Sequence, residues 1–431
     1  MSDKITVGIH TLGCRVNMYE SCAIAEMLTQ RGCEVVKNGK CDYHIVNTCA
    51  VTAESSRKSR QLVRRCAANG KVLVIGCASQ IDPAFADIPN VIYVGGNREK
   101  GRVVNRICDG AQDAVENAVK SMDNAEYERL SLNGTDELFS ECRAFIKIQD
   151  GCNGKCTYCI IPKCRGKVRS RPIEEVIDEA ERLITNGYRE IILTGIEVGA
   201  YNHAPLADLI CRVSELEGLK RLRLGSLSPN VVSDSFLKKV SDAKCFMPHI
   251  HLSLQSCNDR VLKDMMRPYR KKEIYDRVEA IRRYIPNCAI SADIIVGFPG
   301  ETEQEFLETV DALNELQIFH VHSFPYSERE GTIAASMPDS VPKSVRGERN
   351  SRLIESCAQT KRRLLDDCIG KSCSVLIEKI VDGFAFGHTE QFYEAKFDAE
   401  DHKVGSIVSI NVSSHNDEIL CGAYDRSEER L

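Results

Sequence analysis

The sequence of 431 residues lacks long hydrophobic runs. No stretch approaches the roughly 18 uninterrupted apolar residues of a membrane-spanning helix. The first residues, Met-Ser-Asp-Lys-Ile-Thr-Val, do not form a signal peptide. We therefore expect a cytoplasmic chain with no membrane partner.

Other common signals are also missing. The sequence has no internal repeat, no low-complexity tract and no glycine-rich loop that would cradle a phosphate. Its formal net charge of −5 gives no general reason to expect nucleic-acid binding. A hydrophobic content of 43% and a charged content of 28% are ordinary for a globular protein. The length allows two or three domains.

Cysteine, by contrast, is abundant, with 21 residues. In a large cytosolic chain this number indicates metal chemistry together with inert buried thiols. Cys152, Cys156 and Cys159 have the spacing Cys-x3-Cys-x2-Cys, and Tyr158 precedes the last thiol. Three thiolates on one loop suit a 4Fe-4S cluster in which one iron has no protein ligand. Because Cys164 is a possible fourth ligand, a closed cluster or zinc site stays an alternative.

The first hundred residues alternate short apolar runs with helical patterns, which predicts a parallel α/β sheet. The predicted strands are Ile5–Ile9, Tyr43–Val46, Val72–Ile75 and Val91–Val94, and the predicted helices are Met18–Gln30 and Ser55–Ala68. Cys14, Cys49 and Cys77 each follow a predicted strand. Because ligands of such sheets gather beyond the carboxyl ends of the strands, we expect these three thiols to meet at one rim.

A second α/β series begins at Arg143, after a polar segment, residues 108–141, that we interpret as a linker able to hold one helix. Its predicted strands are Phe145–Ile148, Glu190–Leu193, Arg221–Leu224, Ile250–Leu254, Ala289–Val296 and Phe319–Ser323, with helices such as Ile173–Thr185 and Glu303–Leu316 between them. Six units are too few for a closed eight-stranded barrel and fit an open partial barrel. The cysteine loop directly follows the first of these strands.

The pattern changes after Met337 to a charged helix, Val345–Asp367, and then to short strands punctuated by glycine. This tail predicts a small β-barrel. The expected fold is therefore α/β with three parts. They are an N-terminal Rossmann-like domain at 1–107, an open (β/α)6 barrel at 142–368 after the linker, and a small β-barrel at 369–431.

The cysteine loop resembles the cluster loop of radical S-adenosylmethionine (SAM) enzymes, and the whole chain resembles the methylthiotransferases. The N-terminal cysteines match in their flanking residues: Gly-Cys-x-x-Asn at Cys14, Asn-Thr-Cys-x-Val at Cys49 and Gly-Cys at Cys77. The barrel contributes His251-Leu-Ser-Leu-Gln-Ser256 and Asp293-Ile-Ile-Val-Gly-Phe-Pro-Gly-Glu-Thr302. The tail, with Gly387-His-Thr-Glu390, is similar to a TRAM domain.

The resemblance implies a transferase with two 4Fe-4S clusters that consumes two SAM molecules. Members of the family use one SAM to methylate a sulfur carried on an auxiliary cluster. A second SAM is split into methionine and a radical that removes a hydrogen from an unactivated carbon. The implied ligands are Cys14, Cys49 and Cys77 for the auxiliary cluster and Cys152, Cys156 and Cys159 for the SAM-binding cluster. An electron donor such as flavodoxin or ferredoxin is an implied partner.

The same resemblance suggests where SAM is held. The bend between Gly297 and Gly300 would let the backbone approach the adenosine. Side-chain candidates are Tyr158, Gln255, Ser256 and Asp293. The polar residues among them could instead only cap loops. Cys257 stands where relatives usually carry glycine, so the local loop geometry is open, since glycine tolerates a positive φ far better than cysteine.

The substrate is implied by Thr11-Leu-Gly-Cys-Arg-Val-Asn17, which looks like the branch that acts on N(6)-threonylcarbamoyladenosine beside the tRNA anticodon (position 37). The tRNA anticodon loop is then the partner. The candidate phosphate contacts are Arg165, Lys167, Arg169 and Arg171. However, residues 370–431 carry twelve acids against six Lys and Arg, which disfavours RNA contact there.

Three alternatives stay open. Two share the chemistry: methylthiolation of isopentenyladenosine in tRNA, and methylthiolation of a ribosomal protein side chain, for which the acidic tail would be a natural docking surface. The third is a non-catalytic iron–sulfur or zinc module that binds RNA. The barrel motifs at His251–Ser256 and Asp293–Thr302 argue against this third alternative, because a binding module has no need of a SAM pocket.

Overall fold

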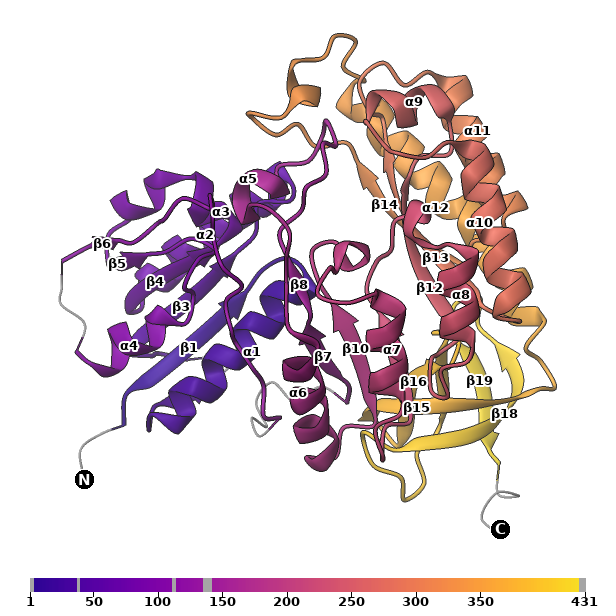
Figure 1. The fold of residues 1–431 in the computed structure, drawn as a ribbon, viewed down its shortest axis with the longest axis horizontal. Coiled ribbons are helices and arrows are strands. Elements are labelled where there is room, and N and C mark those ends of the chain that lie inside the picture. The colour runs from indigo at the N-terminus through magenta and orange to yellow at the C-terminus, as the bar shows by residue number, and fades with distance from the viewer. Residues whose placement is uncertain (1–3, 37–38, 111–113, 135–141, 426–431) are drawn as a thin grey trace.

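The computed structural model describes residues 4–36, 39–110, 114–134 and 142–425. Its N-terminal part is a parallel six-stranded sheet in the order β2-β1-β3-β4-β5-β6 (Figure 1). The strands are β1 Thr6–Thr11, β2 Glu34–Val36, β3 Tyr43–Thr48, β4 Lys71–Gly76, β5 Val91–Val94 and β6 Glu116–Asn117. The helices are α1 Arg15–Gln30, α2 Ala53–Ala67, α3 Cys77–Ile81 and α4 Arg102–Cys108, with a 3-10 turn at Pro83–Asp87. The four predicted strands and both predicted helices are present, and the short β2 and β6 are additional.

Each face of this sheet has its own core. Ile45 and Val46 are neighbours in β3 but pack into different cores, because successive strand residues point to opposite faces. Ile45 packs with apolar residues of α1 and α4, whereas Val46 packs with Val63 and Cys66 of α2. Helix α2 begins where the Thr52 hydroxyl accepts the Ser55 N–H, a standard N-cap.

The segment interpreted as a linker is packed against the rest of the protein. Its described residues are 108–110 and 114–134. Apart from Cys108, which ends α4, they form β6 and irregular chain, so the possible separate helix is not found among them. Leu130 and Leu132 are buried in the main core. The Tyr19 hydroxyl of α1 donates to the Leu130 carbonyl at 2.6 Å. The segment therefore joins the N-terminal sheet to the second α/β series.

That second series consists of two parallel three-stranded sheets, β11-β10-β7 and β12-β13-β14. Their strands are β7 Ala144–Lys147, β10 Glu190–Thr194, β11 Arg221–Leu224, β12 His249–Gln255, β13 Ala289–Val296 and β14 His320–Pro325. In the described residues only isolated bridges, Leu222 with Phe246 and Leu227 with Leu252, connect the two sheets. The six predicted strands are confirmed, and they form an open partial barrel.

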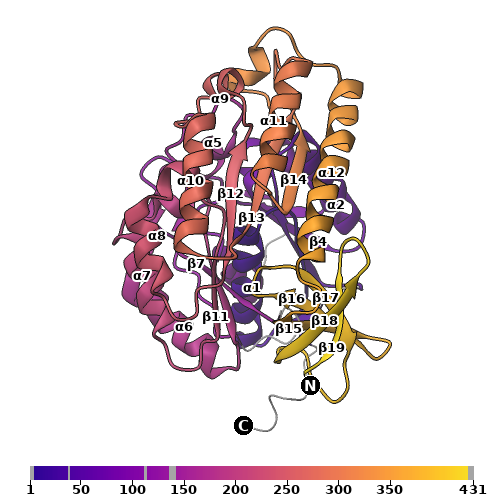
Figure 2. The same ribbon diagram turned by 90° about the vertical axis from the view of Figure 1, so that its right-hand side faces the viewer.

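Helices cover the outside of this barrel (Figure 2). They are α6 Ile173–Thr185, α7 Leu206–Ser214, α8 Asp234–Ser241, α9 Asp259–Asp264, α10 Lys271–Tyr284, α11 Glu303–Glu315 and α12 Lys343–Asp366. Shorter elements are the antiparallel pair β8 Gln149–Asp150 and β9 Arg169–Ser170, helix α5 Ile161–Arg165, and 3-10 turns at Val198–Ala200, Pro229–Val231 and Ile333–Ser336. None of the described helices is both long and apolar enough to span a membrane.

The C-terminal residues form a closed five-stranded barrel in the order β15-β16-β17-β19-β18. Its strands are β15 Ser372–Val381, β16 Phe384–Thr389, β17 Glu394–Asp398, β18 Ile407–His415 and β19 Leu420–Tyr424. Two buried arginines of β11 hold it to the large barrel. Arg221 donates to the His388 carbonyl at 3.0 Å and Arg223 to the Thr389 carbonyl at 2.8 Å. The predicted fold class is confirmed.

Candidate functional site

The three N-terminal cysteines lie at one rim of the sheet, as predicted. Cys49 follows β3 directly and Cys77 follows β4 directly, while Cys14 lies three residues beyond β1. These three strands are adjacent and parallel. Gly13 has a φ of 99°, and a Cβ built there would stand 2.7 Å from the Cys49 sulfur. A glycine is therefore needed for the loop that brings Cys14 beside Cys49.

Cys77 has the most polar surroundings of the three thiols. The buried Arg165 guanidinium donates through Nε to the Cys77 sulfur at 3.4 Å, and the Asn97 amide donates to the same sulfur at 3.4 Å. A hydrogen bond from Cys164, followed by the charges of Arg165 and Lys100, lowers the pKa of Cys77 to about 5. Burial instead raises the pKa of Cys49 to about 11. The rim thus already stabilises one thiolate, the form that binds iron.

The structure separates Cys164 from the cysteine loop. Cys164 lies on α5, is fully buried, and its thiol is the hydrogen-bond partner of Cys77. Its carbonyl accepts from the Asn97 amide at 3.0 Å. The structure therefore gives no support to Cys164 as a fourth ligand beside Cys152, Cys156 and Cys159.

The loop triad lies between β8 and α5, with all three thiols half-buried. The turn is closed by the Cys159 N–H, which donates to the Cys156 carbonyl at 3.1 Å. The Gly154 N–H donates to the Cys152 sulfur at 3.2 Å. Burial raises the pKa of Cys159 to about 12, so iron binding at this loop must displace a proton.

A second buried arginine serves this triad. Arg267 donates through Nη1 to the Cys156 sulfur at 3.2 Å. Its guanidinium is fixed by the Tyr269 hydroxyl at 2.7 Å, the Ser228 hydroxyl at 3.1 Å and the Ser253 carbonyl at 3.1 Å. The sequence gives no signal for this role of Arg267, because no motif spacing links it to Cys156.

Both triads border one cavity of about 370 Å³, whose lining includes Cys14 and Cys159. Tyr158, Gln255 and Asp293, three of the predicted SAM contacts, also line it. Its remaining wall is largely apolar, with Ile161, Ile295, Phe324 and Tyr326. Two sites that are 75 residues or more apart in the chain therefore border the same mostly apolar cavity.

A larger cavity of about 650 Å³ adjoins it, since Cys14, Asp293 and Phe324 border both. Histidines form much of its wall: His249, His251, His320, His322 and His388. His251 Nε2 lies 3.1 Å from the Asp293 carboxylate. Arg15, Arg143 and Lys361 add cationic side chains.

The other predicted SAM contacts lie outside the linings of these cavities. Ser256 is buried, and its hydroxyl lies 3.3 Å from the Thr309 hydroxyl. Gly297 and Gly300 both have positive φ, 71° and 73°. A Cβ on Gly297 would stand 2.4 Å from Cγ of Arg346, so packing on α12 already accounts for this glycine.

The loop after β12 explains how cysteine replaces the expected glycine. Gln255, and not Cys257, takes the left-handed conformation, with a φ of 67°. Cys257 is fully buried in the main core. A glycine is therefore not required at position 257 for this turn.

The structure corrects the predicted phosphate contacts. The prediction is wrong for Arg165 and Arg171, because both guanidinium groups are buried in ion pairs. Arg165 pairs with Glu20 and Asp150, and Arg171 pairs with Glu179. Arg169 is largely buried and donates to the carbonyls of Arg165 and Lys167, each at 2.8 Å. Of the four cations, Lys167 alone is exposed.

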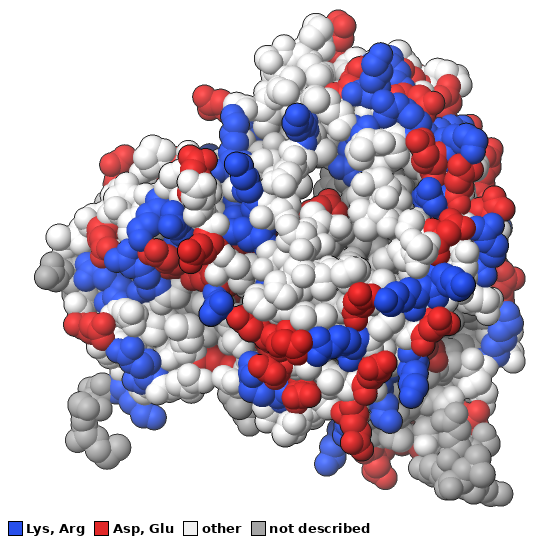
Figure 3. Space-filling model, viewed as in Figure 1, with Lys and Arg blue, Asp and Glu red and all other residues white. Residues whose placement is uncertain are grey.

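On the face of the molecule in Figure 3, lysine and arginine side chains are interspersed with acidic ones. This surface offers no simple cationic track for an RNA backbone.

Two family models match this chain, and each match contains one of the two triads. Residues 146–313 match the model of the radical SAM superfamily, and residues 6–93 match that of the uncharacterized protein family UPF0004. The chain is 35% identical to threonylcarbamoyladenosine tRNA methylthiotransferase MtaB of Bacillus subtilis (strain 168), over 94% of this chain and 93% of the relative. It is 36% identical to the protein of the same name from Thermotoga maritima, over 97% of each.

A relative with a different name is also similar. The tRNA-2-methylthio-N(6)-dimethylallyladenosine synthase of Agrobacterium fabrum is 30% identical over 96% of each chain. Among solved structures, the radical SAM methyltransferase TsrM of Kitasatospora setae, with cobalamin and a [4Fe-4S] cluster bound, superposes with a TM-score of 0.58. It covers 89% of this chain and 80% of its own at 16% identity, so it supports the fold alone.

Proposed function

The chain belongs to the radical SAM tRNA methylthiotransferases, and we propose that it converts N(6)-threonylcarbamoyladenosine beside the tRNA anticodon to its 2-methylthio derivative. It is a transferase whose cofactors are 4Fe-4S clusters and SAM. The observation that carries the proposal is the single cavity bordered by Cys14 of one triad and Cys159 of the other.

The residues present fit two clusters. Each triad offers three thiols on its own loops. The Cys164 thiol, from α5, contacts Cys77, and we propose that it stays outside the auxiliary cluster, so that one iron of each cubane is open to another ligand. Each triad also receives a hydrogen bond from a buried arginine, which stabilises anionic sulfur. We assign one cluster to Cys14, Cys49 and Cys77 within residues 1–107, and the other to Cys152, Cys156 and Cys159 within 142–368.

SAM would be held in the smaller cavity by Tyr158, Gln255 and Asp293. When bound, the clusters and two SAM molecules supply the radical and the methylthio group. The residues of this chain hold the reactants and exclude water. The apolar side chains of Ile295 and Tyr326 would limit the access of water to the space between the triads, which would protect a reactive species from quenching.

The larger cavity suits the modified base, because Cys14 borders it as well. The threonylcarbamoyl group ends in a carboxylate, whereas a dimethylallyl group is apolar. Lys361 lines this cavity, and among the described residues no hydrogen bond or ion pair occupies its ammonium. A flipped-out base from a single-stranded loop could place its carboxylate there. The greater identity to the two relatives named for threonylcarbamoyladenosine supports this choice.

The direct test is mass spectrometry of tRNA nucleosides from cells with and without the gene. We expect 2-methylthio-threonylcarbamoyladenosine to vanish on deletion, while 2-methylthio-isopentenyladenosine persists. The reverse result would favour the isopentenyl branch. Unchanged tRNA, with a ribosomal protein lighter by one methylthio group, would favour a protein substrate.

The assignment of Lys361 has its own test in the reconstituted enzyme. In a reaction with tRNA and a flavodoxin- or ferredoxin-type electron donor, Lys361→Met should lower kcat/KM for threonylcarbamoyl tRNA by about tenfold. Lys361→Arg, which keeps the charge, is the matched control and should retain most activity. An equal loss in both variants would contradict a role in carboxylate binding.

A further inference from the structure

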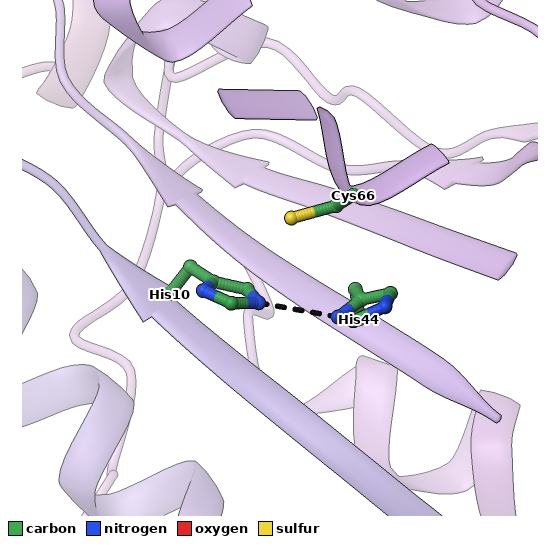
Figure 4. Close-up of side chains that lie close together, drawn as sticks. All are labelled: His10, His44 and Cys66. Atoms are coloured by element: carbon green, nitrogen blue, oxygen red, sulfur yellow. Dashed lines mark hydrogen bonds between the residues drawn. The ribbon is translucent and has the colours of Figure 1, made fainter. Parts of the chain in front are cut away.

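Two histidines and a cysteine outside both triads converge on one face of the N-terminal sheet (Figure 4). His10 extends from β1, His44 from the adjacent β3, and Cys66 from α2, which covers this face. One ligand atom from each, a ring nitrogen or a sulfur, lies within 4.8 Å of the other two. Neither the proposed reaction nor the two cluster assignments uses these residues.

The spacing of the two imidazoles fits a shared metal ion. His10 Nε2 lies 3.1 Å from His44 Nδ1. Two nitrogens bound at 2.0–2.1 Å to one tetrahedral zinc ion stand about 3.3 Å apart. The two rings are tilted by 36° to each other, and the two nitrogens face each other along a hydrogen bond that a bound metal ion would replace (Figure 4).

A fourth donor and open space lie beside them. A Cβ built on Gly8 would stand 3.0 Å from His44 Nδ1, 3.4 Å from His10 Nε2 and 3.1 Å from the sulfur of Cys41. Gly8 has no positive φ, so its backbone does not require glycine. The missing side chain keeps the space between these ligand atoms open, and Cys41 is buried next to it.

The chemical state of these groups suits metal binding. His44 is 3% exposed, so a metal bound at its Nδ1 would be shielded from solvent. Burial lowers the pKa of His10 and of His44, which keeps both rings neutral, the form that ligates metals. Burial raises the pKa of Cys66 to about 11, and a bound metal would displace that proton.

We propose that His10, His44, Cys66 and Cys41 bind one zinc ion, separate from both iron–sulfur clusters. A mixed set of two imidazoles and two thiolates in a tetrahedral arrangement is typical of structural zinc. The ion ties α2 and the loop before β3 to strands β1 and β3. Those two strands lead directly into Cys14 and Cys49, so the ion would fix the rim that carries the auxiliary triad.

The test uses the full chain, purified anaerobically from medium with zinc and carrying its iron. Elemental analysis should find about one zinc per chain in addition to the cluster iron. Zinc K-edge X-ray absorption detects zinc alone and is blind to the clusters. It should show two nitrogens at about 2.0–2.1 Å and two sulfurs at about 2.3 Å.

Variants connect the ion to these residues. His44→Gln and Cys66→Ala should each reduce zinc at least tenfold while iron content stays unchanged. The matched controls are His203→Gln, at an exposed histidine, and Cys357→Ala, at a buried cysteine of α12. Both controls should keep their zinc.

Two results would overturn the proposal. One is wild-type protein that binds no zinc when titrated with one equivalent. The other is zinc in an all-sulfur environment, which would place it in vacant cluster triads. If His44→Gln fails to fold, the absorption spectrum of the wild type still decides, because it needs no variant.

Discussion

The two cysteine triads offer the same number of thiols but are assembled in different ways. Cys152, Cys156 and Cys159 lie on one loop, whereas Cys14, Cys49 and Cys77 come from the ends of three adjacent strands. The loop triad depends on local chain geometry. The strand-end triad depends on correct pairing of β1, β3 and β4, so it forms only when the sheet has formed.

The arginines beside the two triads differ in the charge of their hydrogen-bond partners. Arg165, beside Cys77, is neutralised by the carboxylates of Glu20 at 3.1 Å and Asp150 at 3.0 Å. Glu20 also binds Lys100 and Lys147, so a buried charge network joins the N-terminal sheet to the barrel. Arg267 donates hydrogen bonds to neutral oxygens and to the Cys156 sulfur. Arg165 therefore belongs to a charge network that stabilises the fold, whereas Arg267 keeps its positive charge beside the loop triad.

The largest expected effect separates the chemical roles of the triads. Cys159→Ala and Cys77→Ala should both abolish methylthio transfer. We expect only Cys159→Ala to abolish 5′-deoxyadenosine formation from SAM under reducing conditions, because only its cluster would cleave SAM. Chromatography of the reaction products measures both compounds. Full iron content in the Cys77→Ala variant, or loss of SAM cleavage there, would contradict the assignment.

The next effect concerns stability. Arg165→Met should leave the buried negative charges of Glu20 and Asp150 only partly balanced. We expect it to lower the free energy of unfolding by about 3–5 kcal/mol, the usual result of breaking a buried ion pair. Urea unfolding measures the loss. Lys167→Met is the matched control, since Lys167 is exposed and its removal should change stability by about 0.5 kcal/mol or less. Equal effects would mean that the Arg165 network is not a stabilising feature.

Sequence patterns predicted most strands and helices, because the pattern of each element lies within a short stretch of chain. Val91–Val94 is a short apolar run, and Arg221–Leu224 alternates arginine with leucine; the predicted bounds of both strands agree with the structure. β2 and β6, with three and two residues, are too short to produce a pattern. The loop triad is readable from spacing alone. The strand-end triad also required the strand order.

Features that depend on tertiary packing could not be predicted. Arg165 stands in a run of alternating cations, which is typical of an exposed face, but in the structure it is fully buried. Arg267 is 111 residues from Cys156. His10, His44 and Cys66 come from three elements, and only the register of β1 with β3 and the position of α2 bring them together.

A smaller effect tests the charge beside the loop cluster. Arg267→Met should retain iron but lower the midpoint potential of that cluster, because removing a positive charge favours the more oxidised, less anionic state. A charge-assisted hydrogen bond worth about 1–2 kcal/mol corresponds to about 40–90 mV for a one-electron couple. Arg267→Lys should shift less. Spectroscopic redox titration measures the shift, and an unchanged potential would show that Arg267 only positions Cys156.

The smallest expected effect concerns His320 and His322, two of the histidines that line the larger cavity. Burial, with smaller contributions from His322 and Lys361, lowers the pKa of His320 to about 4, and burial also lowers the pKa of His322. The unfolded chain takes up protons near pH 6.5, whereas the folded chain does so only near the lower value. The unfolded state therefore binds more protons in this window, and stability should fall as the pH drops from 6.5 towards 4.

His320→Asn should make this fall shallower by on the order of 1 kcal/mol, measured by urea unfolding at pH 7 and pH 5. His203→Gln, at an exposed position, should leave the slope unchanged. The same slope in the His320→Asn variant would contradict the prediction, because it would show that His320 titrates in the folded chain as it does in the unfolded chain.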